Sequence, residues 1–78
     1  MTRYYFDLRD GNIFIADPEG LDLLDIAEAQ IEAAEFLGDM VKDISMREAM
    51  PAGFPMSVEV RQENEIVLIL GFMYPKAD

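Results

Sequence analysis

Residues 3–20 read RYYFDLRDGNIFIADPEG, and this stretch decides the fold because two short apolar runs flank Asp10-Gly11. Asp-Gly is among the strongest signals for a two-residue type I′ turn, since both central residues of that turn need positive φ. The stretch therefore predicts a β-hairpin with Asp10 and Gly11 as its loop, which sets Leu8 opposite Ile13. The core face of the hairpin then carries Phe6, Leu8, Ile13 and Ile15.

A long amphipathic helix is predicted after this hairpin. Asp25, followed three residues later by Glu28, has the form of a helix start in which Asp25 is the cap. The helix should run from about Ile26 to about Glu48 and end before Pro51, because the residue before a proline avoids helical conformation. At 100° per residue one apolar stripe appears, and it should face a sheet. This stripe comprises Ile26, Ala29, Ala33, Phe36, Leu37, Met40 and Ile44.

The rest of the helix surface divides into an acidic side and a flank of small or apolar residues. The acidic side carries Glu28, Glu32, Glu35 and Asp39. The flank carries Ala27, Ile31, Ala34, Gly38 and Val41. Such a flank would let another helix approach closely, although alanine is also simply the best helix former. The acidic side is typical of a solvated helix face, and it also suits a basic partner.

Two further strands are predicted after a connecting loop at residues 51–55. Residues 56–62, MSVEVRQ, alternate between apolar and polar side chains, as a half-buried strand does. The turn between the strands falls at residues 63–65, where Asn64 tolerates the left-handed conformation. Residues 66–74, IVLILGFMY, are apolar at every position, which is typical of a strand that is central or covered on both faces.

The predicted order is β-β-α-β-β in a single domain that comprises residues 1–78. The simplest structure for this order is an α+β fold, a four-stranded, mainly antiparallel sheet with one long helix packed on one face. One helix covers only one side of a sheet, so the other side should expose large apolar groups. The last strand contributes one of two sets to that side, depending on turn register: Val67, Ile69 and Met73, or Ile66, Leu68, Leu70 and Phe72.

The uncovered sheet face is the candidate interaction site. Monomeric soluble proteins seldom expose contiguous apolar patches beyond a few hundred Å², so we expect a second copy of the chain or another protein to cover this face. The alternative is that loops and chain ends fold over it, or that Lys and Arg stems shield it. The predicted interface residues are Tyr5, Phe14, Val67, Ile69 and Met73.

Composition narrows the classes of function. The chain has 78 residues with 16 acidic and 6 basic side chains, a formal net charge of −10, and neither cysteine nor histidine. Disulfides, thiolate metal sites and the usual imidazole bases are therefore excluded. The negative charge disfavours nucleic-acid phosphates and anionic membranes, and the longest apolar run is far shorter than the ~20 residues that span a bilayer. The N-terminus lacks a signal-peptide pattern, so we expect a cytoplasmic protein.

No catalytic constellation stands out in the sequence. Hydroxyl side chains other than the tyrosines are few, and none lies beside an obvious base. Most acidic residues fall on turns or on the outer helix side, where no cleft separates them into an acid and a base. Glycine-rich phosphate loops are also missing. We therefore expect no enzymatic activity, no cofactor and no metal. The expected assembly is a homodimer, and the alternative is a complex with a basic protein.

The motif RYYFDLRDG, the following D-x-EG turn, the helix rich in Glu-Ala pairs and the strand Val58-Glu59-Val60-Arg61 resemble a family of small proteins of rhizobia and related α-proteobacteria. That family is a domain of unknown function, so the resemblance implies the architecture and a bacterial cytoplasmic setting but no active site. The final strand departs from the family's more alternating pattern. This continuous apolar character strengthens the expectation of an interface in this chain.

A weaker likeness is to the partial-RNase-H-like domain of HicB-type antitoxins. Those domains also begin with a D-G hairpin, continue through a P-E-G-like turn and enter a helix rich in Glu-Ala pairs. They usually have a third strand before the helix, whereas residues 21–25 are short and polar here. The likeness implies that an acidic protein of this kind would neutralise a basic, RNA-targeting partner.

Overall fold

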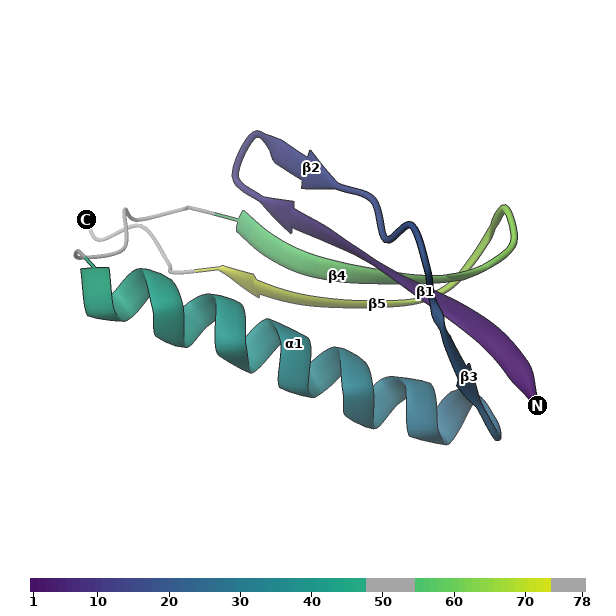
Figure 1. Cartoon of the computed structure of the whole chain (residues 1–78). Helices are drawn as coiled ribbons and strands as arrows, with labels where there is room; N and C mark the ends of the chain where they lie inside the picture. Colours follow the sequence, from purple (N-terminus) through teal and green to yellow (C-terminus); the bar gives the residue numbers. More distant parts are fainter. Residues whose placement is uncertain (48–54, 74–78) are drawn as a thin grey trace.

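A computed structural model describes residues 1–47 and 55–73 of the chain, with backbone alone at residues 44–47 and 55. It has two layers, an antiparallel sheet of five strands and one helix that lies across one face of the sheet (Figure 1). The predicted α+β class is therefore confirmed. The elements are β1 (Thr2–Asp10), β2 (Ile13–Ile15), β3 (Leu21–Leu23), α1 (Ile26–Arg47), β4 (Pro55–Gln62) and β5 (Glu65–Met73).

The strands lie in the order β2-β1-β4-β5, and the short β3 also pairs with β1. Because β2 pairs with the end of β1 and β3 with its beginning, the two short strands follow each other along one edge of β1 (Figure 1). At the opposite edge of the sheet lies β5. Of the two alternatives for the last apolar strand, central or covered on both faces, the first is wrong, because the alternating strand β4 inserts between β1 and β5. Tyr74, the last residue of that predicted strand, lies outside the described residues.

The first hairpin differs in register from the prediction. Leu8 lies opposite Ile15 and Asp10 opposite Ile13, so the loop is Gly11-Asn12. Gly11 has a φ of 64° whereas Asp10 stays extended in β1, and glycine at the first loop position is typical of a type II′ turn. A shift of two residues keeps each side chain on its predicted face. Ile13 and Ile15 are nevertheless exposed, because α1 packs mainly against β4 and β5.

The core lies between α1 and the central strands. Its buried side chains are Tyr4, Phe6, Ala29, Ala33, Val58 and Val60. The helix approaches the sheet closely because its two fully buried residues are alanines, and the rings of Phe6 and Phe36 pack with centroids 5.3 Å apart. The predicted stripe is confirmed at five positions, Ala29, Ala33, Phe36, Leu37 and Met40.

The ends of α1 follow from local chemistry. Asp25 is the predicted cap, since its Oδ1 accepts the backbone N–H of Glu28 at 3.1 Å. Ile26, the first residue of the predicted stripe, is 44% exposed at this end. The described helix ends at Arg47, whereas the predicted end at Glu48 and the side chain of Ile44 lie outside the described residues.

Two further details were not predicted: the left-handed residue of the second hairpin turn and the short strand β3. Gln62 pairs with Glu65, and the left-handed residue of that turn is Glu63, with a φ of 53°, instead of Asn64. Residues 21–23 form the strand β3 although they are short, because Leu21 lies opposite Tyr4 and the carboxylate of Asp22 pairs with an arginine of β1.

Candidate functional site

The sheet face that points away from α1, here called the outer face, carries four of the five predicted interface residues. Strand register assigns Tyr5, Phe14, Ile69 and Met73 to it, since paired residues share a face. Val67 instead packs against the core cluster. The cause is an irregularity beside Val60, where β5 carries one residue more than β4 and the alternation breaks.

The centre of the outer face is charged, and this divides the apolar residues into separate groups. The guanidinium of Arg61 lies 4.5 Å from the ring centroid of Tyr5, and that of Arg9 lies 4.7 Å from the ring of Phe14. Arg9 also pairs with Glu59 at 3.1 Å. Arginine stems therefore shield Tyr5 and Phe14, as in the alternative that the sequence left open, and neither ring joins the apolar residues of β5.

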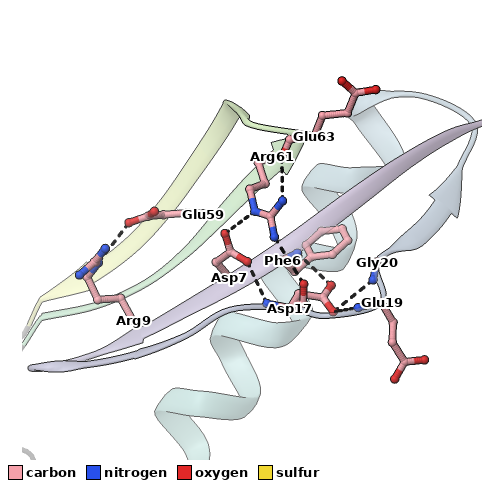
Figure 2. Close-up of polar contacts among 9 residues, drawn as sticks. All are labelled: Phe6, Asp7, Arg9, Asp17, Glu19, Gly20, Glu59, Arg61 and Glu63. Carbon is pink, nitrogen blue, oxygen red and sulfur yellow. Dashed lines mark hydrogen bonds and ion pairs between the residues drawn. The ribbon is translucent and has the colours of Figure 1, made fainter.

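A buried ion pair joins β1 to β4 on this face (Figure 2). Asp7 is only 4% exposed, and its Oδ2 accepts a hydrogen bond from Nε of Arg61 at 2.7 Å. Its Oδ1 accepts the backbone N–H of Asp17 at 2.9 Å. The side-chain hydrogen bond to Asp7 raises the pKa of Arg61 above its ordinary value. No pattern in the sequence indicates this pair, because its members lie on strands far apart in the chain.

Asp17 fills the gap between β2 and β3. Its Oδ2 accepts the backbone N–H of Phe6 at 3.1 Å, a donor of β1 that neither short strand reaches. Its Oδ1 accepts the N–H groups of Glu19 and Gly20, which makes an Asx turn (Figure 2). Burial alone would raise the pKa of the Asp17 carboxyl, but these backbone hydrogen bonds and Arg61 together hold it below its ordinary value. The turn at residues 17–20 was predicted, but this role was not.

Gly20 completes the same turn for a steric reason. Its φ is +75°, and a Cβ at this position would lie 2.9 Å from the carbonyl oxygen of Tyr4. The glycine therefore lets the chain turn back against β1 and begin β3. Asp7, Asp17 and Arg61 are all bonded to one another or to backbone groups, so this network stabilises the fold. Among the described residues no group of acidic side chains is arranged to hold a metal ion.

The other candidate surface is the free edge of β5, and hydrogen-bond directions identify its polar groups. In an antiparallel sheet, alternate residues direct their N–H and C=O groups to opposite sides. Phe6 donates its N–H to Asp17, on the side away from β4. Leu8, two residues further, therefore also directs its groups away from β4, and so its partner Val58 directs its own groups away from β1, toward β5.

The same alternation carries across to β5. Val58 lies opposite Leu70, so these two residues exchange hydrogen bonds. Ile69, Gly71 and Met73 then direct their N–H and C=O groups out of the sheet. In the part of the chain that the structure describes, no strand pairs with this edge. A row of backbone donors and acceptors thus stands unpaired along a nine-residue strand.

An open groove of about 500 Å³ runs beside this edge, between β5 and the helix flank identified from the sequence. Its walls include Ala34, Gly38 and Val41 of α1, and Leu70 and Phe72 of β5. The flank residue Ile31 is 61% exposed. Apolar surface therefore continues from the β5 strand onto the helix, while Ile13, Phe14 and Ile15 of β2 expose a second apolar group at the opposite edge.

Comparison with known proteins places the chain in a family. No described helix is long and apolar enough to cross a membrane. No curated protein and no solved structure shows significant similarity to the chain. Residues 3–71 match the family described as Domain of unknown function (DUF6894). This match confirms the expected membership of a family of unknown function. A rhizobial source and kinship to HicB-type antitoxins stay predictions. Because this match covers most of the 78 residues, the chain belongs to the DUF6894 family.

Proposed function

We propose that this domain is a non-enzymatic protein-interaction module that self-associates through the free edge of β5. The observation that carries the proposal is the composition of that edge. β5 is nine residues long, and after Glu65 it contains no charged residue and no proline. Natural edge strands are usually kept from pairing with other chains by lysine, proline, bulges or short length. The irregularity at Val67 lies near the start of β5, and the part of the edge from Leu68 to Met73 has none of these features, so that part is suited to strand addition.

Exposed side chains add to the unpaired backbone. Ile66, Ile69 and Met73 are 52%, 57% and 61% exposed. Burying the exposed half of each one contributes on the order of 1 kcal/mol. A chain of this length buries only a modest share of its unfolded surface, so contacts with a second copy would contribute substantially to the stability of the folded state.

Sedimentation velocity over a range of micromolar concentrations tests this proposal. The variant Ile69→Lys places a charge on the β5 edge, and Ile13→Lys is a matched control because Ile13 is equally exposed, at 59%, on the opposite edge. We expect the wild type and Ile13→Lys to dimerise at tens of micromolar and Ile69→Lys to remain monomeric. A wild type that stays monomeric throughout, or equal dimerisation of all three proteins, contradicts the proposal.

A second candidate function is binding of a basic protein, as in an antitoxin. Two observations favour it: the acidic side of α1 includes exposed Glu35 and Asp39, and β3 supplies the third strand that HicB-type domains have before their helix. A small basic protein encoded next to this chain would be the partner to test, by titration calorimetry with Glu35→Lys as the variant. Affinity reduced several-fold is expected. Unchanged affinity, or no heat of binding, excludes this function.

A further inference from the structure

The free edge of β5 and the groove beside it together fit a second copy of the chain in one particular arrangement. We infer that two copies pair their β5 strands antiparallel about a twofold axis at Leu70, and that their α1 helices flank the junction. This inference rests on the proposed self-association and adds to it a register and a second layer of contacts.

The register follows from the hydrogen-bonding groups of the strand. In an antiparallel pair, residues that direct their groups to the shared edge must lie opposite each other. A twofold axis therefore falls at a residue, not between two residues. The irregularity at Val67 breaks the alternation of β5, so only residues 67–73 can form a regular ladder, and an axis at the middle residue of that segment, Leu70, pairs it over its full length. An axis at Ile69 or Gly71 would leave two residues of the segment unpaired in each strand.

The charge distribution favours a second copy over a different partner. The chain carries a net charge of −10, so two copies repel one another unless they meet at an uncharged surface. Between Ile66 and Met73 the edge is uncharged, and among the described residues Lys42 is the only charged side chain on the walls of the groove. A strongly basic partner would find no acidic surface here, whereas the acidic side of α1 would offer one.

Two glycines in regular elements make sense in this arrangement. Glycine inside a helix or a strand destabilises it relative to alanine. A Cβ at Gly38 would meet nothing within 4 Å, and a Cβ at Gly71 would meet its nearest atom, the Met56 carbonyl oxygen, at an ordinary 3.6 Å. No contact among the described residues of a single copy therefore requires either glycine. Both line the groove beside the free edge, where close approach of a second copy would use them.

The helices would lie on the same side of the joined sheet. α1 packs on β4 and β5, and neighbouring strands are about 4.8 Å apart. Across the axis the two helices would approach to roughly 10–15 Å, at which the flanking side chains of packed helices touch. The residues facing each other would be Ile31, Ala34 and Gly38. The groove of each copy would then be closed by the flank of the other.

Cysteine cross-linking tests the register, because the natural chain contains no cysteine. Residues that lie opposite each other beside the axis have Cα atoms within the range that a disulfide spans. A mixture of Ile69→Cys and Gly71→Cys chains should therefore form a covalent dimer under mild oxidation, whereas either variant alone and the opposite-edge variant Phe14→Cys should not. A disulfide in Ile69→Cys alone would move the axis to Ile69, one in Gly71→Cys alone would move it to Gly71, and either result overturns the inference.

Variants of Gly38 test the helix layer. Gly38→Met should raise the melting temperature at concentrations where the protein is monomeric, since the site is open, but should weaken dimerisation at least tenfold. Glu35→Met, on the exposed acidic side of α1, should leave dimerisation unchanged. Equal dimerisation of both variants overturns the helix contact. A dimer by sedimentation without any of these cross-links overturns the register and leaves self-association standing, whereas absence of a dimer overturns the proposed function itself.

Discussion

The two edges of the sheet are built in opposite ways. Along one edge, β1 is covered by two strands of three residues each, and the carboxylate of Asp17 closes the gap between them. A buried ion pair holds this region against β4. The opposite edge is a single uninterrupted strand of nine residues that no described element covers.

This difference separates stability from interaction. At the β2/β3 edge, backbone donors, carboxylates and guanidinium groups satisfy one another, and the strands that expose Ile13 and Ile15 are too short to offer a long row of backbone groups. At the β5 edge, unpaired backbone groups coincide with exposed apolar side chains, and an unpaired edge of that kind is what strand addition requires. Variants on the first edge should therefore change unfolding, and variants on the second should change association.

The largest effect is expected from proline scanning of β5. Leu70→Pro removes an N–H that bonds to β4 and should destabilise the chain by about 3 kcal/mol or more. Ile69→Pro removes an N–H that points out of the sheet, so the monomer should remain folded while dimerisation is lost. Urea unfolding monitored by circular dichroism, together with sedimentation, measures both. If the two variants unfold alike, the assigned direction of the β5 groups is wrong.

Removing the buried carboxylate of β1 should have the next largest effect. Asp7→Ala leaves Arg61 without its partner and the N–H of Asp17 without its acceptor, and should cost about 2–3 kcal/mol of unfolding free energy. Asp22→Ala is the control, because the side chains of Arg3 and Asp22 are each about half exposed. Ion pairs that are exposed to this extent contribute little to the free energy of unfolding. A loss in the control as large as that in Asp7→Ala would refute the special role of the buried pair.

Asp17 should make part of the stability depend on pH. Its pKa is lower in the folded chain than in the unfolded chain. The stability that its carboxylate supplies is therefore complete above its unfolded pKa of about 3.9 and is lost as pH falls through the folded value. Asp17→Asn should be less stable than the wild type at neutral pH, and the difference should shrink in acid. A constant difference between the two proteins from pH 7 to acid would contradict this, as urea titrations can show.

The smallest effect is expected at the second turn. Glu63 has a φ of 53°, a left-handed conformation that is unfavourable for a residue with a Cβ. Glu63→Gly should stabilise the chain by about 0.5–1 kcal/mol and leave dimerisation unchanged, because the turn lies at the end of β5. Thermal unfolding at low protein concentration measures the gain. A loss of stability would show that the Glu63 side chain contributes more than its backbone strain costs.

Structural features that depend on residues close together in the chain were for the most part predicted correctly from local signals in the sequence. The Asp25 cap, the helix from Ile26 and the alternation of Val58 and Val60 all follow from spacing over a few positions. The hairpin loop was misplaced by one residue because Asp10-Gly11 and Gly11-Asn12 are both good turn sequences, and only Gly11 takes positive φ.

Long-range arrangement was beyond these signals. Asp7 and Arg61 meet only after β1 and β4 have paired, and their separation of 54 residues leaves no periodic trace in the sequence. Continuous apolar character was interpreted as evidence of a strand that is central or covered on both faces, and composition alone could not distinguish the central position from an edge that a partner covers. The prediction that this strand belongs to an interface remains one for experiment.

Amide hydrogen exchange within β5, measured by NMR at low and high protein concentration, tests the central claim most directly. The amides of Leu68, Leu70 and Phe72 bond to β4 and should be protected at both concentrations. The amides of Ile69 and Gly71 should exchange rapidly in the dilute protein and become protected as concentration rises. Rapid exchange of Ile69 and Gly71 at every concentration would contradict self-association through this edge.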